Sequence, residues 1–230
     1  MFSLKVARAA AAMLALQTAA GVPILNGEDA KPEEFPSVVG FAPGCAGTTD
    51  LWPSLVIVGA TDRKQQGPGV LTFKISSFYT HPGYDRETPH SEHDIAILKL
   101  SRPVPETANI SYPELSGGVS DPQPGSYTTA VGWGHQGPKK STTVLQKVAL
   151  PIVGRDECGR MFQLTVPDSS FCAGYRDGRK DTCSGDSGGP TYDAEGTVIG
   201  VTMYGTTPCG LGYAFYARVD AHLDFIQQHL

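Results

Sequence analysis

Turn residues divide this chain into short apolar runs, and this division constrains the fold more than any other feature of the sequence. Glycine accounts for 27 and proline for 18 of the 230 residues. Because both residues interrupt helices, most of the chain cannot form long ones. The apolar runs are rich in β-branched side chains, which favour strands. Strands are therefore expected at Ser37–Phe41, Leu55–Val58, Val70–Phe73, Ile95–Leu98, Thr128–Val131, Lys147–Leu150 and Thr197–Val201.

The C-terminal end differs from this pattern. Apolar side chains fall near helical spacing in Val219–Leu230, which predicts a helix there and nowhere else in the chain. The stretch Tyr112–Ser126 is rich in proline, glycine and serine, and is suited to link two halves. No internal repeat typical of a solenoid or propeller occurs. The pattern indicates an all-β sandwich or barrel protein of one or two domains.

The balance of apolar and charged residues excludes several classes of protein. Hydrophobic residues make up 40% of the chain and charged residues 18%, which fits neither a disordered chain nor a coiled coil. The formal net charge of -5 argues against nucleic acid, and against an anionic membrane surface, as a partner.

The first twenty residues have the layout of a secretory signal peptide. Lys5 and Arg8 precede an apolar run that ends in small residues at Ala20, so we expect cleavage after Ala20. The alternative is an N-terminal membrane anchor, but the run is too short to span a bilayer. A secreted, extracellular chain meets an oxidising environment in which cysteines normally pair. The chain has 5 cysteines, an odd number that leaves one without a partner.

One segment carries recognisable chemistry. Asp181–Pro190 reads Asp-Thr-Cys-Ser-Gly-Asp-Ser-Gly-Gly-Pro, with Ser187 in a glycine-rich turn. A serine nucleophile needs an accessible Oγ and backbone N–H groups aimed at the oxyanion that forms. Gly185 would let the main chain approach a substrate carbonyl closely. Taken alone, the segment is equally consistent with an ordinary turn.

Further segments make the interpretation more specific, because together they resemble the trypsin/chymotrypsin family of serine proteases. Asp181–Pro190 is similar to the nucleophile loop of that family. The other segments with a family counterpart are Ile24–Gly27 followed by Glu34–Pro36, Asp94–Leu100, Gly132–Gly134 and Phe171–Tyr175. They occur in the family's order and extend from Ile24 to the C-terminal helix. The resemblance therefore covers nearly all of the chain that follows the signal peptide.

The resemblance implies a fold and a domain organisation. We expect two antiparallel six-stranded β-barrels, with the active site in the cleft between them, and a C-terminal helix. Residues 1–20 would be the signal peptide and residues 21–23 a short pro-segment. Within the peptidase domain, residues 24–112 would form the first barrel. Residues 113–230 would form the second barrel and the helix.

The resemblance also implies roles for individual residues. Ser187 would be the nucleophile, and the N–H groups of Gly185 and Ser187 would form the oxyanion hole. Asp94 would orient and stabilise a catalytic imidazole. Asp186 would pair with the α-amino group of a new N-terminus at Ile24, which is the zymogen switch of the family.

The same comparison implies a specificity pocket. Asp181 would lie at its floor, where a buried carboxylate favours a Lys or Arg side chain of the substrate. Gly205 and Ala214 would line the pocket. The family has glycine at the position of Ala214, and the extra methyl group would narrow the pocket.

The catalytic histidine of the family is missing. The family carries it in a segment similar to Thr-Ala-Ala-His-Cys. Here Cys45–Thr48 begins the region, and Thr49–Ala60 already resembles a later strand. A block of roughly 15–20 residues is absent, judged from ordinary strand and loop lengths. None of the six histidines has the context of the catalytic one: they are His81, His90, His93, His135, His222 and His229.

The odd cysteine supports the same conclusion. In the family, the partner of Cys45 lies beside the catalytic histidine, so its loss leaves Cys45 as a free thiol. The remaining cysteines would form the disulfides Cys158–Cys172 and Cys183–Cys209. One missing block thus accounts for both the absent histidine and the unpaired cysteine, and it predicts an incomplete first barrel.

Smaller departures concern the edge of the site. Met203 stands where the family has a serine that donates to the triad aspartate. Pro23 precedes the expected new N-terminus, where tryptic activation needs Arg or Lys. Asn109–Ser111 forms an N-glycosylation sequon. The loop Arg63–Leu71 lacks the acidic residues of a calcium site, so no metal and no cofactor are expected.

Two functions remain open. The first is a secreted, monomeric, trypsin-like endopeptidase that cleaves protein or peptide substrates after Lys or Arg, with the chain as written inactive for want of its histidine. The second is a non-catalytic homologue, a pseudoprotease, that binds or inhibits a protein partner. Retention of Asp94 and of the Asp181–Pro190 loop favours the first. Met203 and Pro23, together with the missing histidine, favour the second.

Overall fold

The computed structural model describes most of the chain. It covers residues 4–5, 12–15, 24–42, 54–87, 92–117, 121–134 and 142–230. Cys45, His90 and His135, for which the sequence analysis makes predictions, lie outside the described residues, as does the junction between Thr48 and Thr49.

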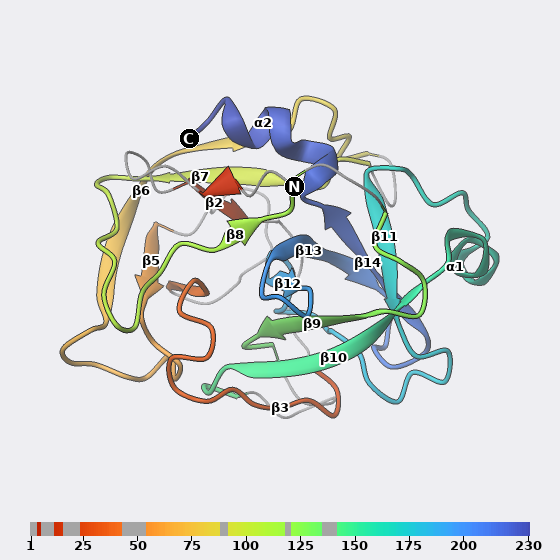
Figure 1. Ribbon diagram of the computed structural model, residues 1–230, viewed down its shortest axis with the longest axis horizontal. Helices are drawn as coiled ribbons and strands as arrows, with labels where there is room; N and C mark the ends of the chain where they lie inside the picture. The colour runs from red at the N-terminus through yellow and green to blue at the C-terminus, as the bar shows by residue number, and fades with distance from the viewer. Residues whose placement is uncertain are drawn as a thin grey trace.

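The C-terminal half forms a closed antiparallel barrel of six strands (Figure 1). The strands follow one another around the barrel in the order β13, β12, β9, β10, β11 and β14, and a pairing between β13 and β14 closes the ring. Their bounds are β9 (Tyr127–Gly132), β10 (Gln146–Val153), β11 (Ser170–Gly174), β12 (Pro190–Tyr192), β13 (Val198–Gly205) and β14 (Tyr213–Arg218).

Alternation along β10 shows how the sequence builds this barrel. Val148, Leu150 and Ile152 are buried, whereas the residues between them are half-buried or exposed. This period of two places every second side chain in the interior. There the three residues pack with Phe171 and Tyr216, whose rings stack with centroids 5.2 Å apart.

The N-terminal half forms an open sheet rather than a closed barrel. Its strand order is β2, β7, β6, β5 and β4. The bounds are β2 (Ala12–Ala15), β4 (Val39–Ala42), β5 (Leu55–Val58), β6 (Leu71–Thr80) and β7 (Ala96–Leu100). The expectation of one complete barrel, one incomplete barrel and a C-terminal helix is therefore confirmed.

Three two-residue strands belong neither to the six-stranded barrel nor to the open sheet. They are β1 (Leu4–Lys5), β3 (Glu28–Asp29) and β8 (Glu114–Leu115). β1 pairs with β8, β8 pairs with β13, and β3 pairs with β10. Two segments of the expected signal peptide, β1 and β2, thus pair with edges of the main sheets. The assignment of residues 1–20 as a signal peptide stays a prediction.

The helices are short. The C-terminal helix was expected over Val219–Leu230, and the structure has a 3-10 turn η1 (Asp220–His222) followed by α2 (Leu223–Gln227). The expectation of only one helix was wrong, because α1 spans Arg155–Phe162. None of the helices in the described part of the chain is long and apolar enough to cross a membrane.

Hydrogen bonds join the open sheet to the barrel. The indole Nε1 of Trp133 donates to the carbonyl of Thr61 at 3.0 Å, and the backbone N–H of Leu145 donates to the same carbonyl at 2.7 Å. The backbone N–H of Arg63 donates to the carbonyl of Thr143 at 2.8 Å. These bonds fix the two halves relative to each other, so that the space between them has a defined shape.

Candidate active site

The loop that contains Ser187 is held by backbone hydrogen bonds to β13 and to itself. The N–H of Gly188 donates to the carbonyl of Thr202 at 2.9 Å, and the N–H of Thr202 donates to the carbonyl of Gly189 at 2.9 Å. Gly185 has φ 96°, a left-handed conformation that glycine adopts without strain. The loop conformation therefore depends on the glycines that the sequence places around Ser187.

A buried carboxylate fixes the loop from inside. Asp186 is 1% exposed and accepts hydrogen bonds from the N–H groups of Gly134, at 2.9 Å, and Cys183, at 3.0 Å. A Cβ atom at Gly132 or Gly134 would overlap the Asp186 carboxylate. This close approach explains in physical terms why the Gly-Trp-Gly segment has glycine on both sides of Trp133. Burial raises the pKa of Asp186 to about 7, although both hydrogen bonds lower it.

The hydroxyl group of Ser187 is half-buried and donates to the carbonyl of Met203 at 3.2 Å. The Met203 side chain is 1% exposed and points into the protein, where its sulfur contacts Ser170 Oγ at 3.6 Å. This position therefore presents a backbone carbonyl to Ser187 and a buried thioether to the core.

Asp94 lies at the start of the buried segment that leads into β7. Burial raises the pKa of its carboxyl to about 7, and no hydrogen bond or cation within the described residues offsets the cost of burying its charge. The ring of Tyr204 is close enough for the Asp94 charge to raise the pKa of the Tyr204 phenol further, beyond the effect of burial. Tyr204 stacks on Phe215 with centroids 4.5 Å apart. The proximity of Tyr204 to Asp94 was not predicted from the sequence, where Met203–Gly205 was compared only with the family's substrate-binding edge.

Asp181 is completely buried, and its two carboxylate oxygens differ. Oδ2 accepts a hydrogen bond from the N–H of Gly210 at 2.9 Å, whereas Oδ1 has no partner among the described residues. Burial raises the pKa of the carboxyl to about 7. Gly205 pairs with Ala214 across β13 and β14, and a Cβ at Gly205 would lie 3.3 Å from the Ala214 methyl group. The methyl group of Ala214 therefore lies close to the backbone of Gly205 on the neighbouring strand.

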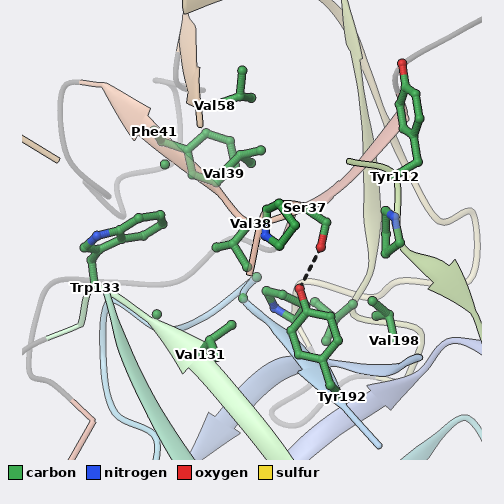
Figure 2. A pocket seen from close by; sticks show the side chains of 18 of the residues that line it. Ser37, Val38, Val39, Phe41, Val58, Tyr112, Val131, Trp133, Tyr192 and Val198 are labelled. Atoms are coloured by element: carbon green, nitrogen blue, oxygen red, sulfur yellow. Dashed lines mark hydrogen bonds between the residues drawn. The ribbon is translucent and has the colours of Figure 1, made fainter. Parts of the chain in front are cut away.

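A cavity of about 160 Å³ opens beside the Ser187 loop, between the open sheet and the barrel. Ser187 and Gly185 line it on one side. Figure 2 shows apolar side chains entering from both halves of the protein, and Ser37 bonded to the Tyr192 hydroxyl at 2.9 Å. The apolar lining includes Val39, Phe41, Val58, Val131, Trp133 and Val198. Polar side chains such as Ser37 and Arg63 also line the cavity, but most of its lining is apolar, which suits the burial of chain or of an apolar ligand.

The segment around Ile24 packs against the same loop. Leu25 forms a bridge with Asp181, in which the N–H of Leu25 donates to the Asp181 carbonyl at 2.8 Å. The Ile24 side chain is completely buried among barrel residues. The start of the expected mature chain is therefore held against the Asp181–Pro190 loop.

Comparison with known proteins identifies the family. Residues 24–226 match the family model described as Trypsin. The chain belongs to the trypsin family. A CLIP domain-containing serine protease B10 from Anopheles gambiae is 35% identical over 163 residues, 69% of this chain and 45% of the relative. A renal glandular kallikrein from Mastomys natalensis is 33% identical over 169 residues, 68% of this chain and 63% of the relative.

A solved structure supports the fold alone. The chain described as "Structure of GrC" covers 89% of this chain with a TM-score of 0.78 at 21% identity, and 98% of that chain is matched. The matches to the mosquito protease and the kallikrein span less than two thirds of those relatives.

Two cysteine pairs of this trypsin-family chain form as expected. Cys158 and Cys172 are bonded and connect α1 to β11, and Cys183 and Cys209 are bonded and connect the Ser187 loop to the segment before β14. Cys45 lies outside the described residues, so its free thiol stays a prediction.

The described histidines of the trypsin-family chain have partners other than Ser187 and Asp94. His81, His93 and His222 form one cluster with ligand atoms within 4.8 Å of one another. The ring of His229 bonds through Nδ1 to the carbonyl of Phe225 at 2.8 Å. This cluster was not anticipated from the sequence, where each histidine appeared in an unrelated context.

Proposed function

We propose that this protein is, in its full form, a secreted trypsin-like endopeptidase that cleaves after Lys or Arg, and that the 230-residue chain is inactive for lack of a base. The observation that carries the proposal is the buried Asp181 carboxylate, with one oxygen unpartnered, next to an ordered Ser187 loop. An unpaired buried charge is costly unless a cationic partner arrives, and a basic substrate side chain is such a partner.

The reaction would be acyl transfer to Ser187. Its Oγ would attack the substrate carbonyl, and the N–H groups of Gly185 and Ser187 would bind the oxyanion. The Oγ proton must leave during the attack, and Asp94 alone cannot take it in the manner of an imidazole. Loss of one triad member lowers kcat by roughly 10⁶ in a related mechanism. We therefore assign the family reaction to a chain that contains the missing histidine block.

The cavity supports the idea of a missing block. Val39 and Phe41 of β4 line the cavity and are only half-buried, whereas a complete first barrel would bury them fully. An unfilled apolar cavity costs roughly 24 cal/mol for each cubic ångström. Further strand material in this space would therefore stabilise the fold and would also carry the base.

Activation is assigned to Ile24 and Asp186. The bridge between Leu25 and Asp181 supports this, because it already holds the residue after Ile24 at the loop. A freed α-amino group could then neutralise the Asp186 carboxylate, which two N–H donors stabilise only in part. Pro23 indicates that the protease that frees Ile24 is not itself trypsin-like. We also assign residues 1–20 to a signal peptide, 21–23 to a pro-segment, 24–112 to the first half and 113–230 to the second.

The pocket is tested first with benzamidine, a small aromatic cation that mimics an arginine side chain. Binding is measured by calorimetry at pH 8 for the unaltered chain and for Asp181→Ser. We expect the variant to bind at least tenfold more weakly, since a charge-assisted hydrogen bond is worth about 1.5–3 kcal/mol. Asp177→Ser is the matched control, because Asp177 is exposed and pairs with Arg179. Equal affinity for all three proteins would overturn the assignment of the pocket.

The catalytic assignment is tested by repair. A family-like segment with its histidine and cysteine is inserted after Thr48, and the chain is processed to begin at Ile24. We expect cleavage of peptide substrates after Lys or Arg, and none in the repaired chain that also carries Ser187→Ala. A repaired chain that folds, binds benzamidine and cleaves nothing would favour the non-catalytic function. A peptide map of the native protein across Glu34–Arg63 shows which form exists.

The alternative, a non-catalytic binding or inhibitor protein, rests on Met203. Its buried thioether cannot donate a hydrogen bond to Asp94, so the site differs from that of an active enzyme beyond the missing block. In the repaired chain, Met203→Ser separates the two functions. A rise in activity with this substitution means that the natural site has moved away from catalysis.

A further inference from the structure

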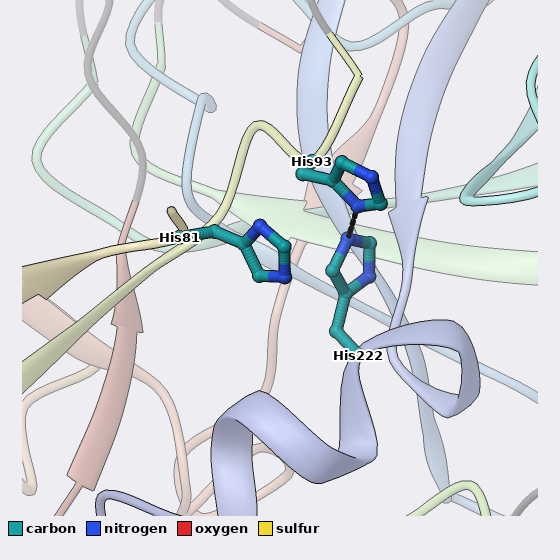
Figure 3. Close-up of side chains that lie close together, drawn as sticks. All are labelled: His81, His93 and His222. Atoms are coloured by element: carbon teal, nitrogen blue, oxygen red, sulfur yellow. Dashed lines mark hydrogen bonds between the residues drawn. The ribbon is translucent and has the colours of Figure 1, made fainter. Parts of the chain in front are cut away.

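Three histidines from distant parts of the sequence meet on the side of the molecule where α2 covers the open sheet. His81 follows β6, His93 lies before β7, and His222 ends η1 (Figure 3). One ring nitrogen from each lies within 4.8 Å of the other two. His222 is buried and the other two are half-buried, so the cluster is accessible to an ion from solvent but is not a mobile surface feature.

The proton positions on His222 leave a lone pair aimed at the cluster. Its Nδ1 lies 2.6 Å from the carbonyl oxygen of Arg218, which can only accept, so Nδ1 carries the proton. Nε2 of His222 is therefore an acceptor. A histidine whose outer N–H is held by a backbone carbonyl is the usual arrangement of a metal ligand.

The second lone pair comes from His93. Its Nδ1 faces the acceptor Nε2 of His222 at 3.1 Å (Figure 3). Its Nε2 lies 4.0 Å from the carboxylate of Glu92. When the His93 proton is on Nε2, towards Glu92, two lone pairs face each other across 3.1 Å. Such a pair is relieved when the His93 proton moves to Nδ1 and is donated to His222 Nε2, or when a metal ion binds both nitrogens.

The third ring completes a metal-binding set. His81 stacks against His93 with centroids 4.4 Å apart and meets His222 edge-on at 5.4 Å. Burial and the two neighbouring imidazoles lower the pKa of His81 to about 4, which keeps its ring neutral at neutral pH. Coordination through Nε2 moves the His81 proton to Nδ1. This breaks the hydrogen bond that the N–H of Gly83 now donates to Nδ1 at 3.1 Å. That adjustment is confined to the turn after β6.

The backbone at His93 is also unusual. Its φ is 57°, a left-handed conformation that costs energy for a residue other than glycine. Strained backbone of this kind persists where the surrounding structure holds it and is concentrated at functional sites. The strain here directs His93 to the cluster, whereas Asp94 next to it enters the buried segment before β7.

We propose that His81, His93 and His222 form a zinc site that fastens the C-terminal helix to the segment preceding Asp94. Three imidazoles leave a fourth, open position for water, which is the tetrahedral arrangement that Zn²⁺ adopts. The cluster offers three imidazole nitrogens, whereas Ca²⁺ and Mg²⁺ bind mainly oxygen ligands. The bound ion would link η1 and α2 to the strands of the open sheet, which lacks the neighbours of a closed barrel.

The test is direct binding of zinc chloride, which requires no enzymatic activity. The full chain is prepared without a polyhistidine tag and with Cys45→Ser, so that neither a tag nor a free thiol binds the metal. Calorimetry at pH 7.5 is expected to give one zinc per chain with a micromolar or lower Kd. His81→Gln is expected to raise Kd at least tenfold. His229→Gln is the matched control and is expected to leave Kd unchanged, because His229 lies at the same end of the chain outside the cluster.

A second measurement is independent of variants that fold poorly. Cobalt(II), added in place of zinc to the Cys45→Ser chain, is expected to give the intense visible absorption of a tetrahedral site, and zinc is expected to abolish it. The unfolding midpoint is expected to rise with zinc and not with magnesium. Absence of stoichiometric zinc binding, an octahedral cobalt spectrum, or equal affinity in His81→Gln and the parent chain would each overturn the proposal. In those cases the His93–His222 pair shares a proton instead.

Discussion

Replacing Asp181 with asparagine should stabilise the protein at alkaline pH while it weakens the binding of a basic ligand. Asparagine has the same shape as aspartate and keeps an oxygen that can accept from Gly210 N–H, now at 2.9 Å from Asp181 Oδ2. The substitution removes the charge and puts an amide NH₂ group in the place of Oδ1, the oxygen that has no partner. It therefore tests the cost of holding an unpaired carboxylate inside the barrel.

The magnitude follows from the pKa of Asp181. Burial raises it from the ordinary value of 3.8 to about 7. At about 1.4 kcal/mol for each pKa unit, this rise corresponds to roughly 4 kcal/mol of lost stability when the group is ionised. Because the folded-state pKa is the higher one, the folded protein retains the proton between pH 4 and pH 7. Stability therefore falls as pH rises through that window and is constant above it.

Urea denaturation followed by tryptophan fluorescence measures the effect. We expect Asp181→Asn to gain about 2–4 kcal/mol at pH 8, with relaxation around the charge accounting for the lower figure, and almost nothing at pH 4. Asp177→Asn, in an exposed pair with Arg179, is expected to show no such gain. An equal gain for Asp181→Asn at both pH values, or a loss at pH 8, would refute the reasoning.

Three further predictions concern the framework of the site. Replacing both cysteines of the Cys183–Cys209 disulfide with serine should cost about 2–4 kcal/mol in urea denaturation, because the bond closes a 26-residue loop; a change below 0.5 kcal/mol would count against it. Gly178→Ala should lower the thermal midpoint strongly and reduce soluble yield, since φ is 64° and a Cβ would overlap the Gly210 carbonyl. Thiol titration of the denatured, unreduced chain should find one free thiol, that of Cys45, and a value near zero would require an intermolecular disulfide.

The sequence predicts most of the strands because their side chains alternate or form short β-branched runs. Tyr213–Arg218 was not identified as a strand, because five of its six residues are buried and give no alternation. Helix α1 was missed for a related reason. Only Cys158 and Gly159 are buried in it, so the apolar stripe that marks a helix is absent. Both elements depend on tertiary contacts that the local sequence does not encode.

The residues of the candidate site also fall into some that the sequence predicts and some that it does not. The loop around Ser187 could be predicted because its function needs consecutive residues with fixed types. The proximity of Tyr204 to Asp94 could not be predicted, since nothing in the local sequence indicates the distance between them. The histidine cluster joins residues as far apart in the sequence as His81 and His222, and His93 has a left-handed backbone that the local sequence does not indicate.

Three carboxylates of this site share one electrostatic condition. Burial raises the pKa of Asp94, Asp181 and Asp186 to about 7, and none has a cationic partner among the described residues. The proposed function assigns a different cation to each: an imidazolium to Asp94, a basic substrate to Asp181 and a freed amine to Asp186. These three carboxylates should therefore bind protons on folding and favour the folded state more at pH 5 than at pH 8, because each folded-state pKa exceeds its unfolded value, whereas the lowered pKa of His81 acts in the opposite direction.

The same argument predicts that each cationic partner restores a separate part of the stability at alkaline pH. A freed amine at Ile24 needs no further chain, so processing alone should recover part of the stability lost between pH 5 and pH 8. Benzamidine should recover a second part, through Asp181, and the inserted histidine segment a third, through Asp94. Urea denaturation of the processed, ligand-bound and repaired proteins at pH 8 measures each contribution. If processing, benzamidine and the inserted segment each leave the stability at pH 8 unchanged, the three carboxylates do not lack these cationic partners.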